Sequence, residues 1–318
     1  MEPIFNVVLP VFAIILCGYA CGRLGVLGEA SSEALNKFVY NVALPVLLFY
    51  SMARVEPAEI FQWSFIAVVA IGNGIIMLLA MTISKVVYGN RLGETALFGM
   101  LSTFGNTGFM GIPLAIVAFG EAAALPAIIA TVFQSSVLLA IVATLIEIDQ
   151  RSAEKFDGAD GSVVADVAAA ICRNPLVLAS VAGIAWSLGG LSLPAPVETF
   201  CQILSPAAGP SALFAIGLFL VGKPLRRGLG ETSVMIALKL VISPLLTWWL
   251  VTRVFDLPAL WAAVALLMSA LPAAANCFVL AQNYGVYVQR TSAMILLSTV
   301  VAVFTVSVVF ALPLMKLP

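Results

Sequence analysis

The sequence contains no histidine and few charged residues, and each shortage removes a class of function. Without imidazole the chain lacks the commonest general base and the commonest transition-metal ligand, so we expect neither a His-dependent enzyme nor a metal site. Charged residues make up 10% of the chain, against about 25% in soluble proteins. With a net charge of −1 and no dense basic patch, nucleic acid is not an expected partner. No Gly-x-x-x-x-Gly-Lys-Ser/Thr loop is present, which argues against ATP as the source of energy.

Apolar residues dominate the chain instead. They account for 62% of the sequence, against about 45–50% in soluble domains. A helix that crosses a bilayer needs about 20 predominantly apolar residues. The apolar runs predict an all-α integral membrane protein with ten transmembrane helices, at about 4–26, 34–53, 61–88, 93–119, 122–147, 167–190, 195–222, 232–254, 257–284 and 291–315.

The basic residues predict how these helices are oriented. If both termini share one side, the opposite side carries 11 of the 15 basic residues, the terminal side carries three, and Lys239 lies inside a span. The 11 are Arg23, Lys37, Lys85, Arg91, Arg151, Lys155, Arg173, Lys223, Arg226, Arg227 and Arg290. Positive charge stays in the cytoplasm, so we expect a multi-pass protein of the plasma (inner) membrane with both termini outside the cytoplasm.

The single markedly polar stretch, near residues 147–166, divides the chain into two sets of five predicted spans. We therefore expect a first repeat at 1–147, a cytoplasmic linker at 148–166 and a second repeat at 167–318. Because five is odd, the two repeats must be inverted relative to each other. Matching prolines support a repeat, since Pro45 and Pro210 lie 165 residues apart, and Pro113 and Pro272 lie 159 residues apart. Inverted repeats with interrupted helices are typical of transporters.

The fourth predicted span contains the strongest local signal, the run Phe104-Gly-Asn-Thr-Gly-Phe-Met-Gly-Ile-Pro113. Pro113 has no backbone N–H, so the carbonyl of Phe109 loses its helical partner. Three glycines permit non-helical backbone, while Asn106 and Thr107 supply polar groups beside it. Irregular backbone at membrane depth survives only where it is buried in protein or lines a wet cavity. The run predicts an unwound segment between two half-helices.

The ninth predicted span contains a matching interruption at Ser269-Ala-Leu-Pro-Ala-Ala-Ala-Asn276. Pro272 frees the carbonyl of Met268, and the small residues allow another helix to approach closely. If the two interruptions cross, two half-helix N-termini meet and form a site for a carboxylate without any Lys or Arg. The alternative is a pair of proline kinks relieved by neighbouring helices.

Several side chains are candidates for this site. The expected substrate-binding residues are Asn106, Thr107, Gly108, Pro113, Pro272, Ala273 and Asn276, with Asn41 from the second span. Asn41 and Pro45 are equally compatible with an interhelical hydrogen bond and a kink. Gln134, Ser135 and Lys239 are candidates for an ion or support site, although Gln134 and Ser135 are also consistent with helix–helix hydrogen bonding and Lys239 with a chain that extends to the interface.

These motifs resemble those of the auxin efflux carrier family, which includes plant PIN-type carriers and bacterial malonate-type permeases. The residues 106–113 resemble the family's helix 4 motif, the residues 271–285 its helix 9 motif, and the residues 41–45 its helix 2 signature. The resemblance extends from end to end of the chain. It implies a scaffold of helices 1, 2, 6 and 7, often dimeric, and a transport domain of helices 3–5 and 8–10. Substrate would bind where helices 4 and 9 cross, at the positions of Asn106 and Asn276, and would move by an elevator-like shift.

The expected function is thus secondary active or facilitative transport of a small organic anion, such as an auxin-like monocarboxylate, malonate or malate. No enzymatic activity and no cofactor are expected, and coupling to Na⁺ or H⁺ stays open. The expected partners are the anion, the lipid bilayer and a second copy of the chain. Two alternatives stand beside this function: a sodium-coupled, bile-acid-like symporter and a membrane sensor that does not transport.

Overall fold

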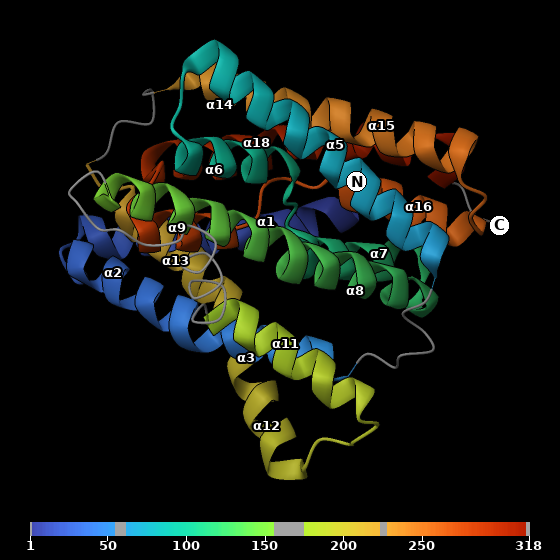
Figure 1. Cartoon of the computed structure of the whole chain (residues 1–318), viewed down its shortest axis with the longest axis horizontal. Coiled ribbons are helices and arrows are strands. Elements are labelled where there is room, and N and C mark those ends of the chain that lie inside the picture. Colours follow the sequence, from blue (N-terminus) through green and yellow to red (C-terminus); the bar gives the residue numbers. More distant parts are fainter. Residues whose placement is uncertain (1, 55–61, 156–174, 223–227, 316–318) are drawn as a thin grey trace.

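The structure is a computed structural model that describes residues 2–54, 62–155, 175–222 and 228–315. Across these residues the chain is helical, with short connections and one isolated pair of bridged residues (Figure 1). The all-α part of the predicted fold is therefore confirmed. Most of the predicted linker, the beginning of the span expected at 167–190 and both chain ends lie outside the described residues.

The helices follow the predicted apolar runs closely. In the first half they are α1 (Glu2–Arg23), α2 (Glu29–Phe38), α3 (Leu44–Ala53), α5 (Trp63–Tyr88), α6 (Leu92–Thr103), α7 (Ile112–Phe119), α8 (Ala124–Phe133) and α9 (Leu139–Lys155). In the second half they are α11 (Pro175–Leu188), α12 (Ala195–Leu204), α13 (Ala208–Phe219), α14 (Leu229–Ala237), α15 (Ser243–Trp249), α16 (Ala259–Ser269), α17 (Asn276–Tyr284) and α18 (Val288–Phe310).

Four helical segments among the described residues are long and apolar enough to cross a membrane. They are Trp63–Tyr88, Ala195–Phe219, Leu229–Val254 and Val288–Phe310. Each coincides with a predicted span, and their outward faces carry large apolar side chains such as Leu78, which is 68% exposed. Such surfaces fit lipid rather than water.

Short π-helical turns join several helices into longer rods. The turns η1 (Val39–Ala43), η2 (Thr107–Gly111) and η6 (Leu238–Ile242) each stand directly before a helix that has proline in its first turn. Proline cannot donate to the carbonyl four residues earlier and its ring clashes with that carbonyl, so the preceding turn widens instead of breaking. Pro45 and Pro113 therefore distort their helices without ending them.

Close helix contacts through glycine hold two pairs of helices together. α1 packs along α13, and α3 packs along α11. A Cβ atom on Gly18 would collide with the carbonyl oxygen of Phe214, and one on Gly183 would lie 2.6 Å from the carbonyl oxygen of Phe49. Only glycine allows backbones to approach this closely.

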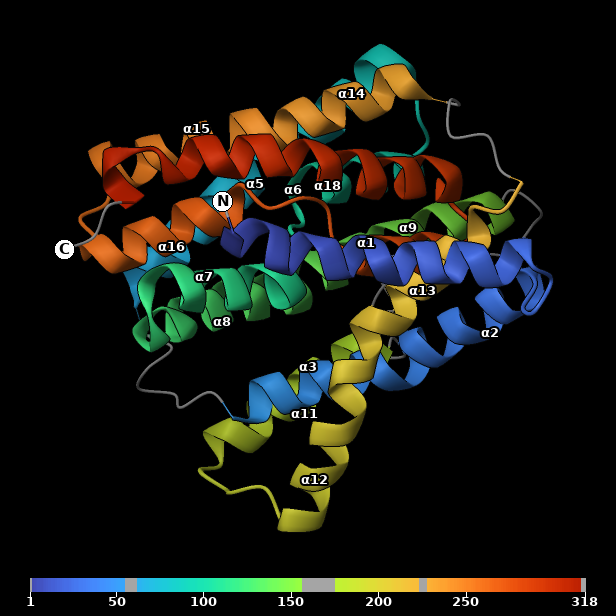
Figure 2. The ribbon, with the colours of Figure 1, turned by 180° about the vertical axis from the view of Figure 1, so that it is seen from behind.

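The remaining helices form a larger body on one side of these pairs. Figures 1 and 2 show α14, α15 and α18 at the far side of the molecule from α3, α11 and the projecting α12. The broken helices α6–α7 and α16–α17 lie between these two regions, so their interruptions fall in the interior. The fold thereby places irregular backbone where protein surrounds it.

The glycine contact between α1 and α13 gives a first prediction. Gly18→Ala should lower the free energy of unfolding by about 1–3 kcal/mol, because the added methyl group meets backbone that cannot yield without moving a helix. Gly74→Ala in α5 is the control, since nothing lies within 4 Å of a Cβ at that position. Thermal unfolding in detergent should show a lower midpoint for Gly18→Ala alone. Equal midpoints for both variants would contradict the packing described here.

Candidate functional site

Two interrupted helices meet through their backbones at the centre of the molecule. After α6 the chain leaves helical geometry at Phe104–Asn106, and after α16 it does so between Ala270 and Ala275. The N–H of Asn106 donates to the carbonyl of Pro272 at 2.7 Å. The N–H of Ala274 donates to the carbonyl of Phe104 at 3.3 Å, which makes an antiparallel bridge around Gly105 and Ala273. We call this paired segment, residues 104–106 and 270–275, the crossover.

The interruption of the fourth predicted span differs from the expected one in position. The expected cause was Pro113 and the lost partner of the Phe109 carbonyl, but residues 107–111 form a π-helical turn and Pro113 lies in the first turn of α7. The chain unwinds earlier, at Phe104–Asn106. Gly105 eases the close approach there, since a Cβ would lie 3.2 Å from the carbonyl oxygen of Met268, a tight contact. The break thus coincides with the close approach of residues 268–274 and not with Pro113.

Side chains from the helix that follows each broken helix complete the crossover. Gln134 Oε1 accepts a hydrogen bond from the N–H of Gly105 at 2.9 Å. Ser298 Oγ accepts one from the N–H of Ala273 at 3.2 Å. Both side chains are buried, so each satisfies a backbone donor that water does not reach. Ser298 was absent from the sequence-based candidates, because nothing near it in the sequence marks it.

Lys239 supports the crossover from the opposite side. Its side chain is fully buried, and Nζ donates to the carbonyl of Ser269 at 2.8 Å. This carbonyl belongs to the C-terminal end of α16, where the helix dipole is negative and a cation is stabilising. The alternative in which Lys239 extends to the membrane interface is therefore wrong.

The second half of each broken helix begins beside an unpaired asparagine. Asn106 precedes η2 and is 3% exposed, and Asn276 begins α17 and is 7% exposed. The Oδ1 atom of each is buried without a hydrogen-bond partner among the described residues. Buried polar groups are nearly always paired, so these two oxygens have unused capacity to accept a hydrogen bond, while the Nδ2 groups are the donors that an anion would need.

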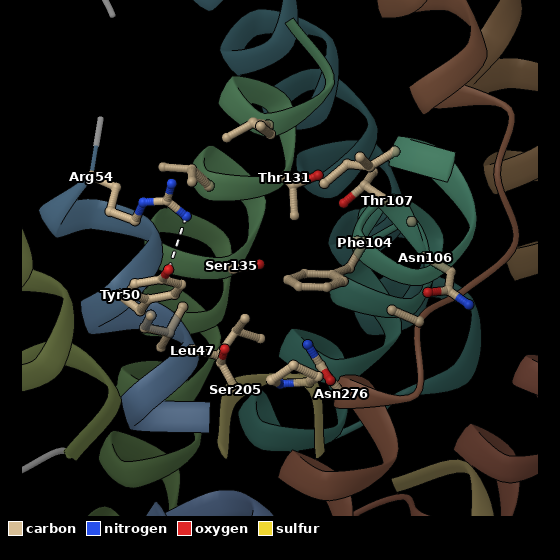
Figure 3. A pocket seen from close by; sticks show the side chains of 18 of the residues that line it. Leu47, Tyr50, Arg54, Phe104, Asn106, Thr107, Thr131, Ser135, Ser205 and Asn276 are labelled. Carbon is tan, nitrogen blue, oxygen red and sulfur yellow. Dashed lines mark hydrogen bonds between the residues drawn. The ribbon is translucent and has the colours of Figure 1, made fainter. Parts of the chain in front are cut away.

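A cavity of about 450 Å³ lies against the crossover. Of the sequence-predicted residues, Asn106, Thr107, Gly108, Ser135 and Asn276 line it. Figure 3 shows the Phe104 ring in the middle, with Thr107 and Thr131 on one side of it and Asn276 and Ser205 on the other. The wall is therefore mixed: an aromatic surface with hydroxyl and amide groups around it.

Other sequence-predicted residues lie elsewhere. Gln134 and Lys239 stand behind the crossover, where they hold its backbone. Pro272 and Ala273 are part of the crossover through their backbone groups. Asn41 is exposed, and its Nδ2 donates to the carbonyl of Lys37 at 2.9 Å. Asn41 is not among the residues that line the cavity, and its amide bonds back to its own helix.

Sequence reasoning missed the charged residue of the cavity. Arg54 follows α3 and lines the cavity with Tyr50. Nη1 of Arg54 donates to Oη of Tyr50 at 2.9 Å, and the guanidinium carbon lies 5.0 Å from the centre of that ring. The sequence had one signal for it: Arg54 is one of only three basic residues on the side predicted to lie outside, where loops are poor in positive charge.

Comparison with known proteins agrees with this architecture. A family model described as "Membrane transport protein" matches residues 3–310. The chain belongs to this family. A relative from Rhizobium meliloti (strain 1021), named "Putative malonate transporter", is 31% identical over 307 residues, which cover 96% of this chain and 95% of the relative. A rice protein (Oryza sativa subsp. japonica), named "Probable auxin efflux carrier component 5a", is 24% identical over 340 residues, 92% of each chain.

A mouse relative shares only part of its length with this chain. The "Lysosomal cholesterol signaling protein" of Mus musculus is 26% identical over 256 residues, which cover 76% of this chain but 29% of that protein. The predicted resemblance to the auxin efflux carrier family is confirmed by the family match and by the rice relative. The protein is accordingly a membrane transporter and not an enzyme.

In this transporter, polar contacts join the helices at the end opposite to Arg54. The hydroxyl groups of Tyr40 and Tyr284 lie 3.2 Å apart, and Tyr284 Oη donates to Oε1 of Glu147 at 2.6 Å. Asn36 Nδ2 donates to the carbonyl of Val279 at 3.1 Å. Glu147 lies about 18 Å further along its helix than the cavity residue Ser135, at 1.5 Å per residue. These contacts join α2–η1 and α9 to α17.

The support of the crossover gives a second prediction. Ser298→Ala removes the acceptor of the Ala273 N–H and should cost about 1–3 kcal/mol of stability, because a buried donor is left unpaired. Ser307→Ala in the same helix is the matched control, since the Ser307 hydroxyl only donates to the carbonyl of Val303. Thermal unfolding in detergent should separate the two variants, and a Ser298→Ala protein as stable as the control would show that Ser298 does not hold the crossover.

Proposed function

We propose that this transporter carries a small organic carboxylate, bound in the cavity beside the crossover. The observation that carries the proposal is that two buried asparagines, Asn106 and Asn276, stand at the starts of two half-helices and line the same cavity of about 450 Å³. A cavity of this size suits a small molecule. The printed name of the Rhizobium relative, which refers to malonate, is consistent with such a substrate.

Recognition would rely on helix ends as much as on side chains. The rods η2–α7 and α17 both begin at the crossover, so their N-terminal N–H groups and positive dipole ends lie beside the cavity. Figure 3 shows the amide nitrogen of Asn276 directed into the cavity, where it can donate to an oxyanion. The Phe104 ring would contact the apolar part of the acid.

We further propose that the ten spans form two inverted repeats, 1–147 and 167–318, joined by the linker 148–166. Symmetric contacts support this arrangement. Gly18 meets Phe214 and Gly183 meets Phe49, and within these contacts both glycines and both phenylalanines are 165 residues apart. The supports of the crossover, Gln134 and Ser298, are 164 residues apart. Such a repeat requires both termini on one side, and the charge distribution favours the outside.

The mechanism would be alternating access by an elevator-like shift. The first, second, sixth and seventh predicted spans (α1, α2–α3, α11 and α12–α13) would form a scaffold, through which two copies of the chain would form a dimer. The other six predicted spans would carry the crossover. The cavity extends from buried Asn276 to exposed Arg54. In this proposal the contacts among Tyr40, Tyr284 and Glu147 would close the path from the cavity to the other side. Breaking these contacts would open the cavity to the opposite side of the membrane.

The amides of the crossover provide the test of the binding site. In proteoliposomes, Asn276→Ala should reduce uptake of a transported acid at least about tenfold, because a hydrogen bond to a charged group contributes roughly 1.5–3 kcal/mol. Asn106→Ala should act in the same direction. Asn283→Ala is the control, because Asn283 is exposed at the far end of the same helix. If both crossover variants transport every acid at the wild-type rate, the site is elsewhere.

Coupling to sodium provides a separate test. Among the described residues that line the cavity there is no Asp or Glu, and hard cations prefer oxygen ligands, carboxylates above all. We therefore expect uptake to remain the same when external Na⁺ is replaced by choline at constant pH. A strict requirement for Na⁺ would instead favour the sodium-coupled symporter.

A further inference from the structure

One wall of the cavity carries a positive charge that faces the crossover. Among the described residues that line the cavity, Arg54 is the one with a charge. Figure 3 shows Arg54 and Tyr50 on the α3 side, across the cavity from Thr107, Phe104 and Asn276. The two ends of the cavity therefore differ: one offers neutral donors from helix ends and amides, and the other offers a guanidinium.

Tyr50 keeps the guanidinium in place and uses only one of its donors. Nη1 of Arg54 donates to the Tyr50 hydroxyl at 2.9 Å, and the two residues are one helical turn apart. A guanidinium carries five N–H donors, so four remain for a ligand. No ion pair of Arg54 occurs within the described residues, in contrast to Lys37, Arg91 and Arg290, which each pair with a carboxylate. The charge is thus held against the cavity and lacks a described carboxylate partner.

We infer that Arg54 binds the second carboxylate of a dicarboxylate whose first carboxylate lies at Thr107 and Asn276. The carbon chain between the two groups would contact the edge of the Phe104 ring, which projects into the cavity between Thr107 and Asn276. This inference rests on the proposed function and narrows it, because it assigns the selection of dicarboxylates over monocarboxylates to one residue on the scaffold side. Arginine suits this role, since its planar fork matches the geometry of a carboxylate.

The physical consequence is a difference between two classes of acid. A monocarboxylate held at the crossover leaves the exposed guanidinium in water, so it gains nothing from Arg54 and loses little without it. A dicarboxylate gains a charge-assisted contact that should improve its KM about 10- to 100-fold. Long-range attraction of anions by the positive charge would raise uptake of both classes and would fall steeply with salt, so it can be separated from direct contact.

The experiment compares acids of equal carbon number in proteoliposomes containing the full-length transporter. Malonate is paired with propionate and succinate with butyrate, at low and at physiological salt. Arg54→Gln should raise the KM of each dicarboxylate about 10- to 100-fold and that of each monocarboxylate less than about threefold. Arg54→Lys, which keeps the charge but not the fork, should lie between wild type and Arg54→Gln. Tyr50→Phe should raise the dicarboxylate KM more mildly. Arg253→Gln, an exposed arginine away from the cavity, should change nothing.

The outcomes separate this inference from the proposed function. If both classes of acid are transported and neither Arg54→Gln nor Arg54→Lys changes the ratio of their KM values, Arg54 does not have this role. The proposed carboxylate carrier would still stand. An equal loss for both classes would also overturn the role of Arg54, because it would assign Arg54 to general attraction or to folding. If the wild-type protein transports none of the four acids while it binds another class of solute, the proposed function fails, and the inference fails with it.

Discussion

The two backbone hydrogen bonds between the broken helices are the interaction on which the rest of the structure depends. Asn106 donates to Pro272 and Ala274 donates to Phe104, at a depth where unpaired peptide groups would each cost several kcal/mol. Interrupted helices are tolerable in a membrane protein because this pairing, together with Gln134, satisfies the exposed donors and acceptors. The interruption thereby places helix ends and amide groups in the apolar interior, where they can contact a polar solute.

The surrounding helices serve this crossover in two ways. Helices that follow the broken ones supply polar side chains to it, and Lys239 neutralises the end of α16. The pairs α1–α13 and α3–α11 form a separate region, held by glycine contacts such as that of Gly183. The cavity lies where these regions face each other, with Arg54 on one side and Asn276 on the other. The substrate would thus bind at the boundary between the two regions, which is also the boundary along which one region would move past the other.

The sequence predicts local features of the fold well and long-range contacts poorly. Apolar length locates the helices, and the Gly- and Pro-containing runs locate both interruptions to within a few residues, because these depend on neighbouring residues. It does not reveal that Ser298 reaches Ala273, or that Arg54 turns toward the cavity, since both depend on how distant helices pack. The same reason applies to Asn41, a candidate for substrate binding. The sequence around a polar residue in a span does not show whether its side chain bonds to a ligand or, as here, to the carbonyl of Lys37.

The most direct test of the central claim, that the crossover is the substrate site, is a cryo-electron microscopy map of the transporter with a transported acid bound. We expect density for the acid between α3 and the start of α17, in contact with Thr107 and Asn276, and absent from a map without the acid. Acid density at another position, such as the apolar groove between α15 and α18, with the crossover cavity empty, would contradict the account.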